Sequence, residues 1–339
     1  MSRIPYRIDV HHHIIPQEYL ESLVSIGVTS PGGVAFPEWS AEATLARMDE
    51  NGIAAAMTSI SAPGIYFGDA GFARDLARRC NEVSARLVQD HPNRFGAFAV
   101  LPLPDVEAAL EELGVALDTL GLDGVVLLTS FGDQYLGDPV FDPLFEELNR
   151  RKTVVYTHPN FPPGSDVPKL GWPAPLMEFV FDTTRAIANL ILNGTLERYP
   201  DIPMIFSHAG GTVPYIAGRI CLAETVPLIR EVAPKGVIAY LKSLYYDTAL
   251  SATPYALTCL RELVDPTQIL FGSDYPFAPQ PDSLMGRTAE DVSRYGGFTD
   301  EELKDVERDS ALRLFPRLAA TWKDPFVRDS EEKAGTVLS

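Results

Sequence analysis

Histidine and aspartate side chains carry most of the chemistry that this sequence offers. Imidazole nitrogens and carboxylate oxygens are together the ligands of zinc, manganese, iron and similar divalent ions. Six residues of these types share one property, since each lies at or just after the end of an apolar run: His11, His12, His13, His158, His208 and Asp274. This distribution suggests a metal site assembled from distant parts of the chain.

His11 and His13 have the spacing that brings two imidazoles to one side of a strand. Alternate residues of a strand point to the same face, so His12 should point to the other face and be packed or hydrogen bonded there. By the same parity, Asp9 should point with His11 and His13. Two roles stay open for Asp9: a ligand or a partner of a ligand, or a carboxylate that caps the strand end.

The elements that must position these residues are short apolar runs rich in β-branched and aromatic side chains. Continuous runs of this kind are typical of buried parallel strands. They span residues 6–10, 54–60, 94–101, 124–128, 153–157, 203–207, 243–247 and 268–272.

Helical patterns separate these runs, and they alternate with the strands along the chain. The clearest cover residues 41–50, with Ser40 as the expected N-cap, and residues 69–89, 106–120 and 182–198. Such alternation through eight strands predicts a (β/α)8 barrel of the α/β class. The carboxyl ends of barrel strands meet at one face, where active sites lie, so the histidines and Asp274 should meet there.

Three further polar or glycine positions have a simpler interpretation. His91 follows a helix within a turn, so it is expected at the surface or as a cation at the helix C-terminus. Gly210 and Gly211 follow His208 and are typical turn residues, although they would also let the backbone approach a ligand closely.

The chain is expected to form a single domain over residues 1–339, with a barrel core over about 6–315. A small insertion is expected at residues 22–37, after the first strand, and a helical extension at the C-terminus. Residues 162–175 are rich in proline and glycine and should form a long loop after the fifth strand. The charged segment 323–339 is expected to be a tail.

Charge and composition exclude several classes of protein. The formal net charge of −18 disfavours binding to nucleic acid or to an anionic membrane surface. The chain also has no apolar run of about 18 residues and no signal-peptide pattern at its N-terminus. Its three cysteines are far apart, which argues against a disulfide framework and favours the cytoplasm: Cys80, Cys221 and Cys259. The motifs of dinucleotide enzymes, P-loop proteins and serine hydrolases are absent.

Several segments together resemble one known family. DVHHHIIP, THP, FSHAGGTVPYIAGRI and GSDYPF occur in the order found in the amidohydrolase-related decarboxylases, over residues 8–277. That group includes the aminocarboxymuconate semialdehyde, γ-resorcylate and 6-methylsalicylate decarboxylases. The resemblance implies His11, His13, His158 and Asp274 as metal ligands. It also implies Asp274 as the proton donor and His208 as a residue beside the metal that acts on a proton relay or on the metal water.

The resemblance further implies a single divalent ion, with zinc expected and manganese as the alternative. Residues 124–129 of the fourth strand contain no lysine, whereas related barrels with two metals often carry a carboxylated lysine there. Two departures narrow the type of decarboxylase. The γ-resorcylate enzymes have glutamates where this chain has His11 and Gly211, and the muconate enzyme has arginines in the stretches that match 32–39 and 221–227.

Because those arginines are missing, a phenolic monoacid is favoured over a dicarboxylate. FDTTRAI and FSHAGGTVP are nearest the 6-methylsalicylate type. A homodimer or homotetramer is expected by the same resemblance. Candidate substrate contacts flank the strand ends: Phe161, Trp172, Arg185, Tyr275 and Phe277, with Arg219 as a further basic residue. Core packing is an equal alternative for the aromatic residues, and a surface or dimer ion pair is favoured for the arginines.

Three functions fit these residues. The first is non-oxidative decarboxylation of an ortho-hydroxybenzoate, with the carboxylate and phenol oxygens on the metal and Asp274 protonating the ring carbon after a change in its pKa. The second is hydrolysis of a lactone, amide or ester by metal-bound water, with Asp274 as general base. The third is a metal-binding barrel without enzymatic activity.

Overall fold

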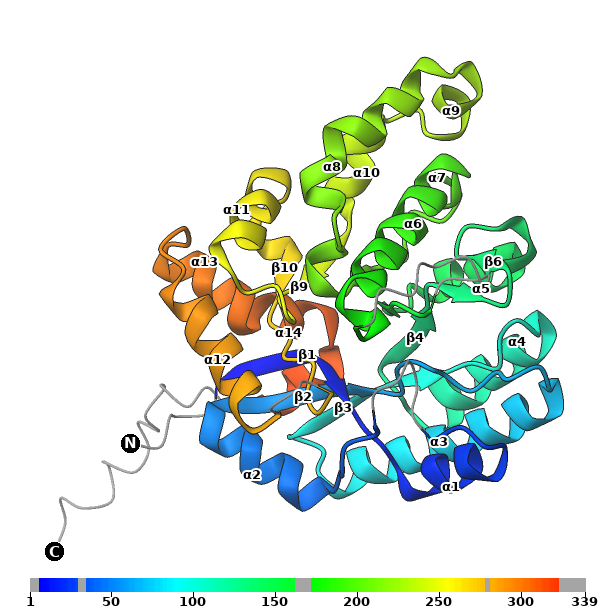
Figure 1. Ribbon diagram of the computed structural model, residues 1–339, viewed down its shortest axis with the longest axis vertical. Helices are drawn as coiled ribbons and strands as arrows, with labels where there is room; N and C mark the ends of the chain where they lie inside the picture. Colours follow the sequence, from blue (N-terminus) through cyan, green and yellow to red (C-terminus); the bar gives the residue numbers. More distant parts are fainter. Residues whose placement is uncertain (1–5, 30–34, 162–171, 278–280, 323–339) are drawn as a thin grey trace, which may run out of the picture.

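The computed structural model describes residues 6–29, 35–161, 172–277 and 281–322. Its main sheet has eight parallel strands in the order β1-β2-β3-β4-β7-β8-β9-β10, curled into a barrel with helices outside it (Figure 1). The strands are β1 (Arg7–His13), β2 (Ile53–Ser59), β3 (Phe95–Val100), β4 (Gly124–Leu128), β7 (Val155–His158), β8 (Met204–Phe206), β9 (Tyr245–Asp247) and β10 (Ile269–Leu270). The predicted (β/α)8 barrel is therefore confirmed.

The barrel closes between β10 and β1 by direct hydrogen bonds and by a helical segment. Val10 N donates to Phe271 O at 2.9 Å, so the segment just after β10 pairs with β1 near the carboxyl ends of the strands. Phe271 N instead donates to Val306 O at 2.8 Å, and Val306 belongs to the π-helix η8 (Asp305–Asp309). The C-terminal extension thus takes part in closing the barrel.

Helices follow the strands around the outside of the barrel. A short antiparallel pair, β5 (Ser130–Phe131) and β6 (Gln134–Tyr135), follows β4. None of the helices among the described residues is both long and apolar enough to cross a bilayer. Their bounds are α1 (Gln17–Ser25), α2 (Ala41–Asn51), α3 (Ala70–Asp90), α4 (Val106–Gly114), α5 (Asp142–Arg151), α6 (Glu178–Leu192), α7 (Thr195–Arg198), α8 (Val213–Ile220), α9 (Pro227–Val232), α10 (Val237–Ser243), α11 (Pro254–Leu263), α12 (Pro281–Arg294), α13 (Asp300–Lys304), α14 (Ser310–Leu314) and α15 (Pro316–Thr321).

Local sequence accounts for several helix ends. The Ser40 hydroxyl accepts a hydrogen bond from Ala43 N at 3.1 Å, as expected for the N-cap of α2. The helix predicted over residues 182–198 is broken, because Gly194 adopts φ 72° and separates α6 from α7. The helix predicted over residues 106–120 ends as a π-helix, η2 (Val115–Thr119).

The predicted insertion at residues 22–37 begins inside α1, and its residues 30–34 lie outside the described part of the chain. Most of the predicted loop at 162–175 and the whole tail at 323–339 also lie outside it. The expected C-terminal helical extension is present as α13, α14 and α15.

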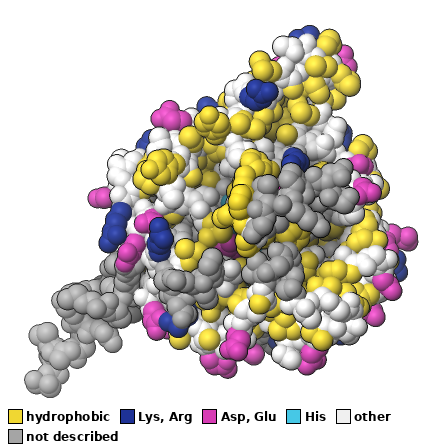
Figure 2. Space-filling model, viewed as in Figure 1, with side chains coloured by type: hydrophobic (Ala, Val, Ile, Leu, Met, Phe, Trp, Pro, Cys, Tyr) yellow, Lys and Arg dark blue, Asp and Glu magenta, His cyan; other side chains and the backbone are white. Residues whose placement is uncertain are grey.

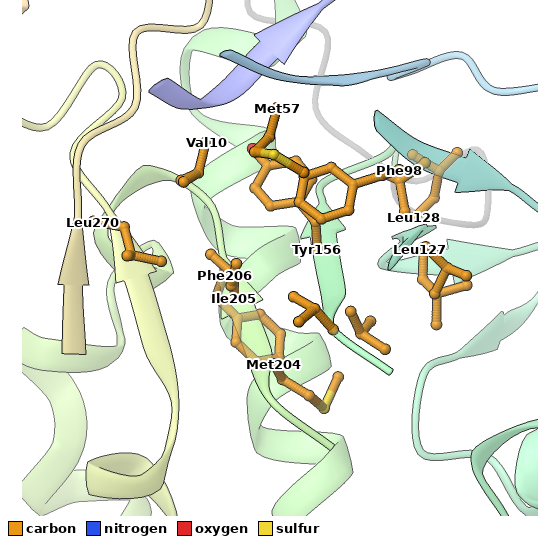
Figure 3. Close-up of a cluster of buried hydrophobic side chains, with 14 of the residues drawn as sticks. Val10, Met57, Phe98, Leu127, Leu128, Tyr156, Met204, Ile205, Phe206 and Leu270 are labelled. Atoms are coloured by element: carbon orange, nitrogen blue, oxygen red, sulfur yellow. The ribbon is translucent and has the colours of Figure 1, made fainter. Parts of the chain in front are cut away.

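Buried apolar and aromatic side chains from most of the strands form one core cluster (Figure 3). Phe98 of β3 and Tyr156 of β7 stack with ring centroids 5.2 Å apart, and Phe315 packs edge-on against Phe98 at 5.7 Å. The Tyr156 hydroxyl donates to Asp247 Oδ2 at 3.2 Å, so this core supports the polar layer described next.

Candidate metal centre and active site

A β-bulge in β1 sets the directions of its polar side chains. Asp9 pairs with Ala56 and His12 with Thr58, so β1 advances by three residues where β2 advances by two. The bulge places Asp9 and His12 on one side of β1, and their side chains meet with His12 Nδ1 2.9 Å from Asp9 Oδ2.

Asp9 therefore does not point with His11, and the parity prediction for Asp9 is wrong because an extra residue in β1 shifts the alternation. Its Oδ1 accepts from His11 N at 3.1 Å and from Ser273 N at 3.0 Å, while its Oδ2 accepts from the Ser273 hydroxyl at 2.5 Å. The capping alternative describes Asp9. The prediction for His12 is confirmed, since its buried ring bonds Asp9 and packs on Tyr275 at 5.0 Å.

Four buried side chains meet at the carboxyl ends of β1, β7 and β10. Ligand atoms of His11, His13, His158 and Asp274 all lie within 4.8 Å of one another. His11 Nε2 and His13 Nε2 are 3.0 Å apart, and each is 3.1 Å from Asp274 Oδ1. Two imidazole nitrogens and a carboxylate oxygen that converge this closely, away from water, fit a divalent cation of the zinc or manganese type.

Partners behind the cluster fix which nitrogen of each histidine faces inward. Donation from Nδ1 leaves Nε2 free to bind a cation, which is the usual arrangement around metal-binding histidines. The Nδ1 contacts are His11 to Asp247 Oδ2 at 2.8 Å, His13 to the Ser59 hydroxyl at 2.9 Å, and His158 to Pro159 O at 2.8 Å.

His208 lies beside the four-residue cluster and outside it. Its Nε2 is 3.5 Å from Asp274 Oδ2, and neither buried ring nitrogen makes a regular hydrogen bond to the described part of the chain. The backbone reaches this position through a left-handed turn, with φ of 54° at His208 and 56° at Ala209. Such conformations are costly for residues with a Cβ and are often found at functional sites.

The Asp274 carboxylate links the cluster to His208. Asp274 also has a left-handed backbone, with φ 65°, and its N–H donates to His11 O at 2.9 Å. One carboxylate oxygen thereby contacts the histidines of β1 while the other faces His208. A single side chain is thus placed both to bind a cation and to exchange a proton.

The charges of the cluster shift the pKa values of its members in opposite directions. Burial lowers the pKa of His11, but Asp247 and Asp274 outweigh burial and raise it to about 10. Burial and the neighbouring His11 lower the pKa of His13 to about 4, despite the hydrogen bond to Asp274. Burial raises the pKa of Asp274, yet the nearby histidines outweigh it and hold that pKa well below its usual range. Asp274 is therefore ionised at rest.

The aromatic substrate candidates fall into two groups. Phe277 packs edge-on against His13 with centroids 5.5 Å apart. Phe161 packs on Phe179 at 5.3 Å, and Phe179 in turn lies 5.7 Å from His158. Phe277 thus borders the cluster directly, whereas Phe161 reaches it through the ring of Phe179.

The remaining candidates lie farther from the cluster or at the surface. Tyr275 packs on His12, on the side of β1 away from His11. Trp172 is 52% exposed. The Arg185 guanidinium is half exposed and 4.0 Å from Asp182, which matches the ion-pair alternative. His91 caps the C-terminal end of α3, as expected from the sequence.

Sequence reasoning missed Asp247, which organises the site from behind. Its carboxylate accepts from His11 Nδ1, from His208 N at 2.9 Å and from Ala249 N at 3.0 Å. Asp247 is fully buried and ends β9. Its position at the end of the apolar run 243–247, the same property that singled out the histidines, was the signal that could have found it.

Comparison with known proteins places this arrangement in a family. The amidohydrolase family model matches residues 8–317. The chain belongs to the amidohydrolase family. Among curated relatives, the decarboxylase yanB of Aspergillus niger is 37% identical, with 92% of this chain and 88% of that protein covered. The 6-methylsalicylic acid decarboxylase of Penicillium expansum is 35% identical, with 92% of this chain and 97% of that protein covered.

Solved structures of the family share the fold. A crystal structure described as an amidohydrolase II superposes with a TM-score of 0.85 at 30% identity, covering 91% of this chain and 99% of the other. The dihydroxybenzoic acid decarboxylase of Polaromonas, solved with manganese and the inhibitor 2-nitroresorcinol, superposes with a TM-score of 0.79 at 23% identity. The superposition covers 92% of this chain and 97% of the Polaromonas enzyme. At 23% identity the similarity concerns the fold alone.

Proposed function

We propose that this amidohydrolase-family protein is a metal-dependent, non-oxidative decarboxylase of a small ortho-hydroxybenzoate-type acid. One observation carries the proposal: the buried Asp274 carboxylate touches the nitrogens of His11 and His13 through one oxygen and faces His208 through the other. This is the connection that a protonation at carbon needs beside a metal site. The decarboxylases of Aspergillus niger and Penicillium expansum, which each match 92% of the chain, support the choice of reaction.

His11, His13, His158 and Asp274 are the proposed ligands of one divalent ion. Zinc is the proposed ion, because imidazole nitrogens and one carboxylate suit it well, and manganese is the alternative. A bound ion supplies Lewis-acid polarisation and fixes the orientation of the substrate.

Asp274 and His208 are the proposed proton-transfer residues. Asp274 is ionised at rest, so the proton that it donates must first reach Oδ2, and His208 Nε2 lies 3.5 Å from this oxygen. Asp274 then gives this proton to the ring carbon that bears the carboxyl group. The bond between that carbon and the carboxyl group then breaks and carbon dioxide leaves. The electron pair of the broken bond stays with the ring and restores its aromaticity.

Asp274→Asn tests this assignment. The amide keeps an oxygen toward the histidines but cannot donate an acidic proton, so turnover should fall by about 10²–10⁴-fold while part of the bound metal is retained. Carbon dioxide release from salicylate-type acids and the metal content by elemental analysis are the two measurements.

An exposed conservative change, Asp265→Asn, is the matched control and should leave both values unchanged. Retained decarboxylation in Asp274→Asn would overturn the role of Asp274. Acid release from a lactone or ester panel, with no carbon dioxide from any hydroxybenzoate, would favour the hydrolase alternative.

A homodimer or homotetramer is proposed for the assembly. The segment from α8 to α9 projects from the barrel, and apolar side chains gather at its end (Figures 1 and 2). Tyr215 is 83% exposed, Leu222 64% and Leu228 62%, and large exposed apolar patches often mark protein interfaces. Light scattering of the purified protein would show a single-chain mass if this proposal is wrong.

A cytoplasmic location is also proposed. The three cysteines are free thiols, which suits a reducing compartment: Cys80, Cys221 and Cys259. Fractionation of the source cells would test this location.

A further inference from the structure

A largely apolar pocket lies beside the proposed metal ligands, at the carboxyl ends of β2, β3 and β4. Its cavity volume is about 40 Å³, and apolar side chains make up most of its wall. A water-sized group needs about 10–15 Å³ of such space, so the pocket suits a small substituent of a ligand and not a whole ring. The wall includes Ile60, Ile65, Val100, Leu101 and Leu128.

Neighbours along the chain and across the sheet relate this pocket to the metal cluster. Ile60 directly follows Ser59, whose hydroxyl bonds His13 Nδ1 at 2.9 Å. Leu128 is the register partner of His158 in the parallel pair β4–β7, and partners in such a pair point to the same side of the sheet. A ring oriented by His13 and His158 therefore has this pocket next to it.

The residues that line the pocket are uncharged. The described residues that line the pocket include no Lys, Arg, His, Asp or Glu. Its polar groups include Ser130, whose hydroxyl is fully buried and has no hydrogen-bond partner within the described structure. An unpaired charge would be costly to bury here, whereas a hydrocarbon group would be favoured.

The pocket is also limited in size where β4 meets the segment after β2. A Cβ added to Gly64 would lie 2.7 Å from Leu128 Cδ1, so Leu128 closes this wall tightly against the backbone. Gly64 has φ 76°, a backbone conformation that favours glycine. Both the conformation and the contact with Leu128 therefore disfavour a side chain at position 64.

We infer that this pocket selects the substrate by the group on the second ortho position of the ring. It accepts a small, uncharged substituent against Leu128 and rejects a second carboxylate or a long alkyl chain. This inference rests on the proposed decarboxylase function and narrows its substrate class to singly charged phenolic acids. Leu128 is the specificity-determining residue.

The test compares salicylates that differ only at position 6. The wild-type protein should turn over 6-methylsalicylate more than about 100-fold better than 3-hydroxyphthalate, which has a carboxylate at that position. Leu128→Ala should raise kcat/KM for 6-propylsalicylate relative to 6-methylsalicylate by about tenfold. Leu127→Ala is the matched control, since Leu127 is also buried but lies on the other side of β4 and outside the pocket wall, and it should leave the ratio unchanged.

Equal changes of this ratio in both variants, or full activity of the wild type on 3-hydroxyphthalate, would overturn the inference. If Leu128→Ala does not fold, the milder Leu128→Val should change the ratio in the same direction. Calorimetric binding of 3-methylphenol and 3-propylphenol to the metal-loaded variants separates this inference from the proposed function. Size selection by Leu128 in binding, without carbon dioxide from any acid, would overturn only the decarboxylase proposal.

Discussion

At the scale of single residues, the site is defined by opposed charges held out of water. Asp247 and Asp274 flank His11 and raise its pKa to about 10, while burial lowers the pKa of His13 to about 4. At neutral pH the metal-free site therefore carries a proton on His11 and none on His13. A metal ion needs an unprotonated nitrogen, so binding must displace the proton of His11.

This charge pattern predicts how metal affinity depends on pH. His11 loses its proton only as the pH approaches about 10, so affinity should keep rising above pH 7 and should not level off near the ordinary histidine pKa. Zinc titration calorimetry at pH 8 in buffers of different ionisation enthalpy should show about one proton released per ion. Asp247→Asn removes one of the charges that raise the pKa of His11. In this variant, zinc affinity should reach its maximum, and stop rising with pH, at a lower pH than in the wild type. A plateau already reached at pH 7 in the wild type would contradict the account.

At the scale of elements, the turn after β8 decides where His208 lies. A Cβ added to Gly211 would stand 2.1 Å from Val180 O, and one added to Gly210 would stand 2.6 Å from the Tyr246 ring. These glycines permit a close approach of the turn to α6 and β9. The β1 bulge has a comparable role, because it turns Asp9 away from His11 and onto the side of His12.

Gly211→Ala should disturb this turn. Gly211 has φ 66° and no room for a side chain, so the substitution should displace His208 and reduce the free energy of unfolding by about 1–3 kcal/mol or more. Gly218→Ala on α8 is the control, since that Cβ would meet nothing within 4 Å, and it should be neutral or slightly stabilising. Chemical denaturation and carbon dioxide release measure the two effects. Equal stability of the two variants would show that the turn tolerates a side chain.

At the scale of the whole molecule, the C-terminal helices close the barrel at the seam between β10 and β1. Arg7 of β1 bonds Glu307 of η8 at 2.7 Å, with their side chains only 5% and 2% exposed. Breaking a buried ion pair leaves an uncompensated charge, whereas replacing both partners by apolar residues removes that cost.

Glu307→Ala should therefore reduce the free energy of unfolding by about 3–5 kcal/mol, as for other buried pairs that lose one partner. The double variant Arg7→Met with Glu307→Leu should recover much of this loss. Urea denaturation of the three proteins checks the prediction. A double variant as unstable as Glu307→Ala would indicate that the charges themselves hold the seam.

The sequence by itself determined the eight strands, the barrel and the strand-end histidines and aspartate from which a metal site could be built, because alternation of short apolar runs and their polar ends are local properties. Tertiary structure alone decided the direction of Asp9, since one extra residue in β1 reverses the alternation that parity assumes. It also decided that Asp247 stands behind His11 and that the neutral pocket is built from β2, β3 and β4. These features depend on which side chains meet across strands distant in sequence, and no local pattern contains that information.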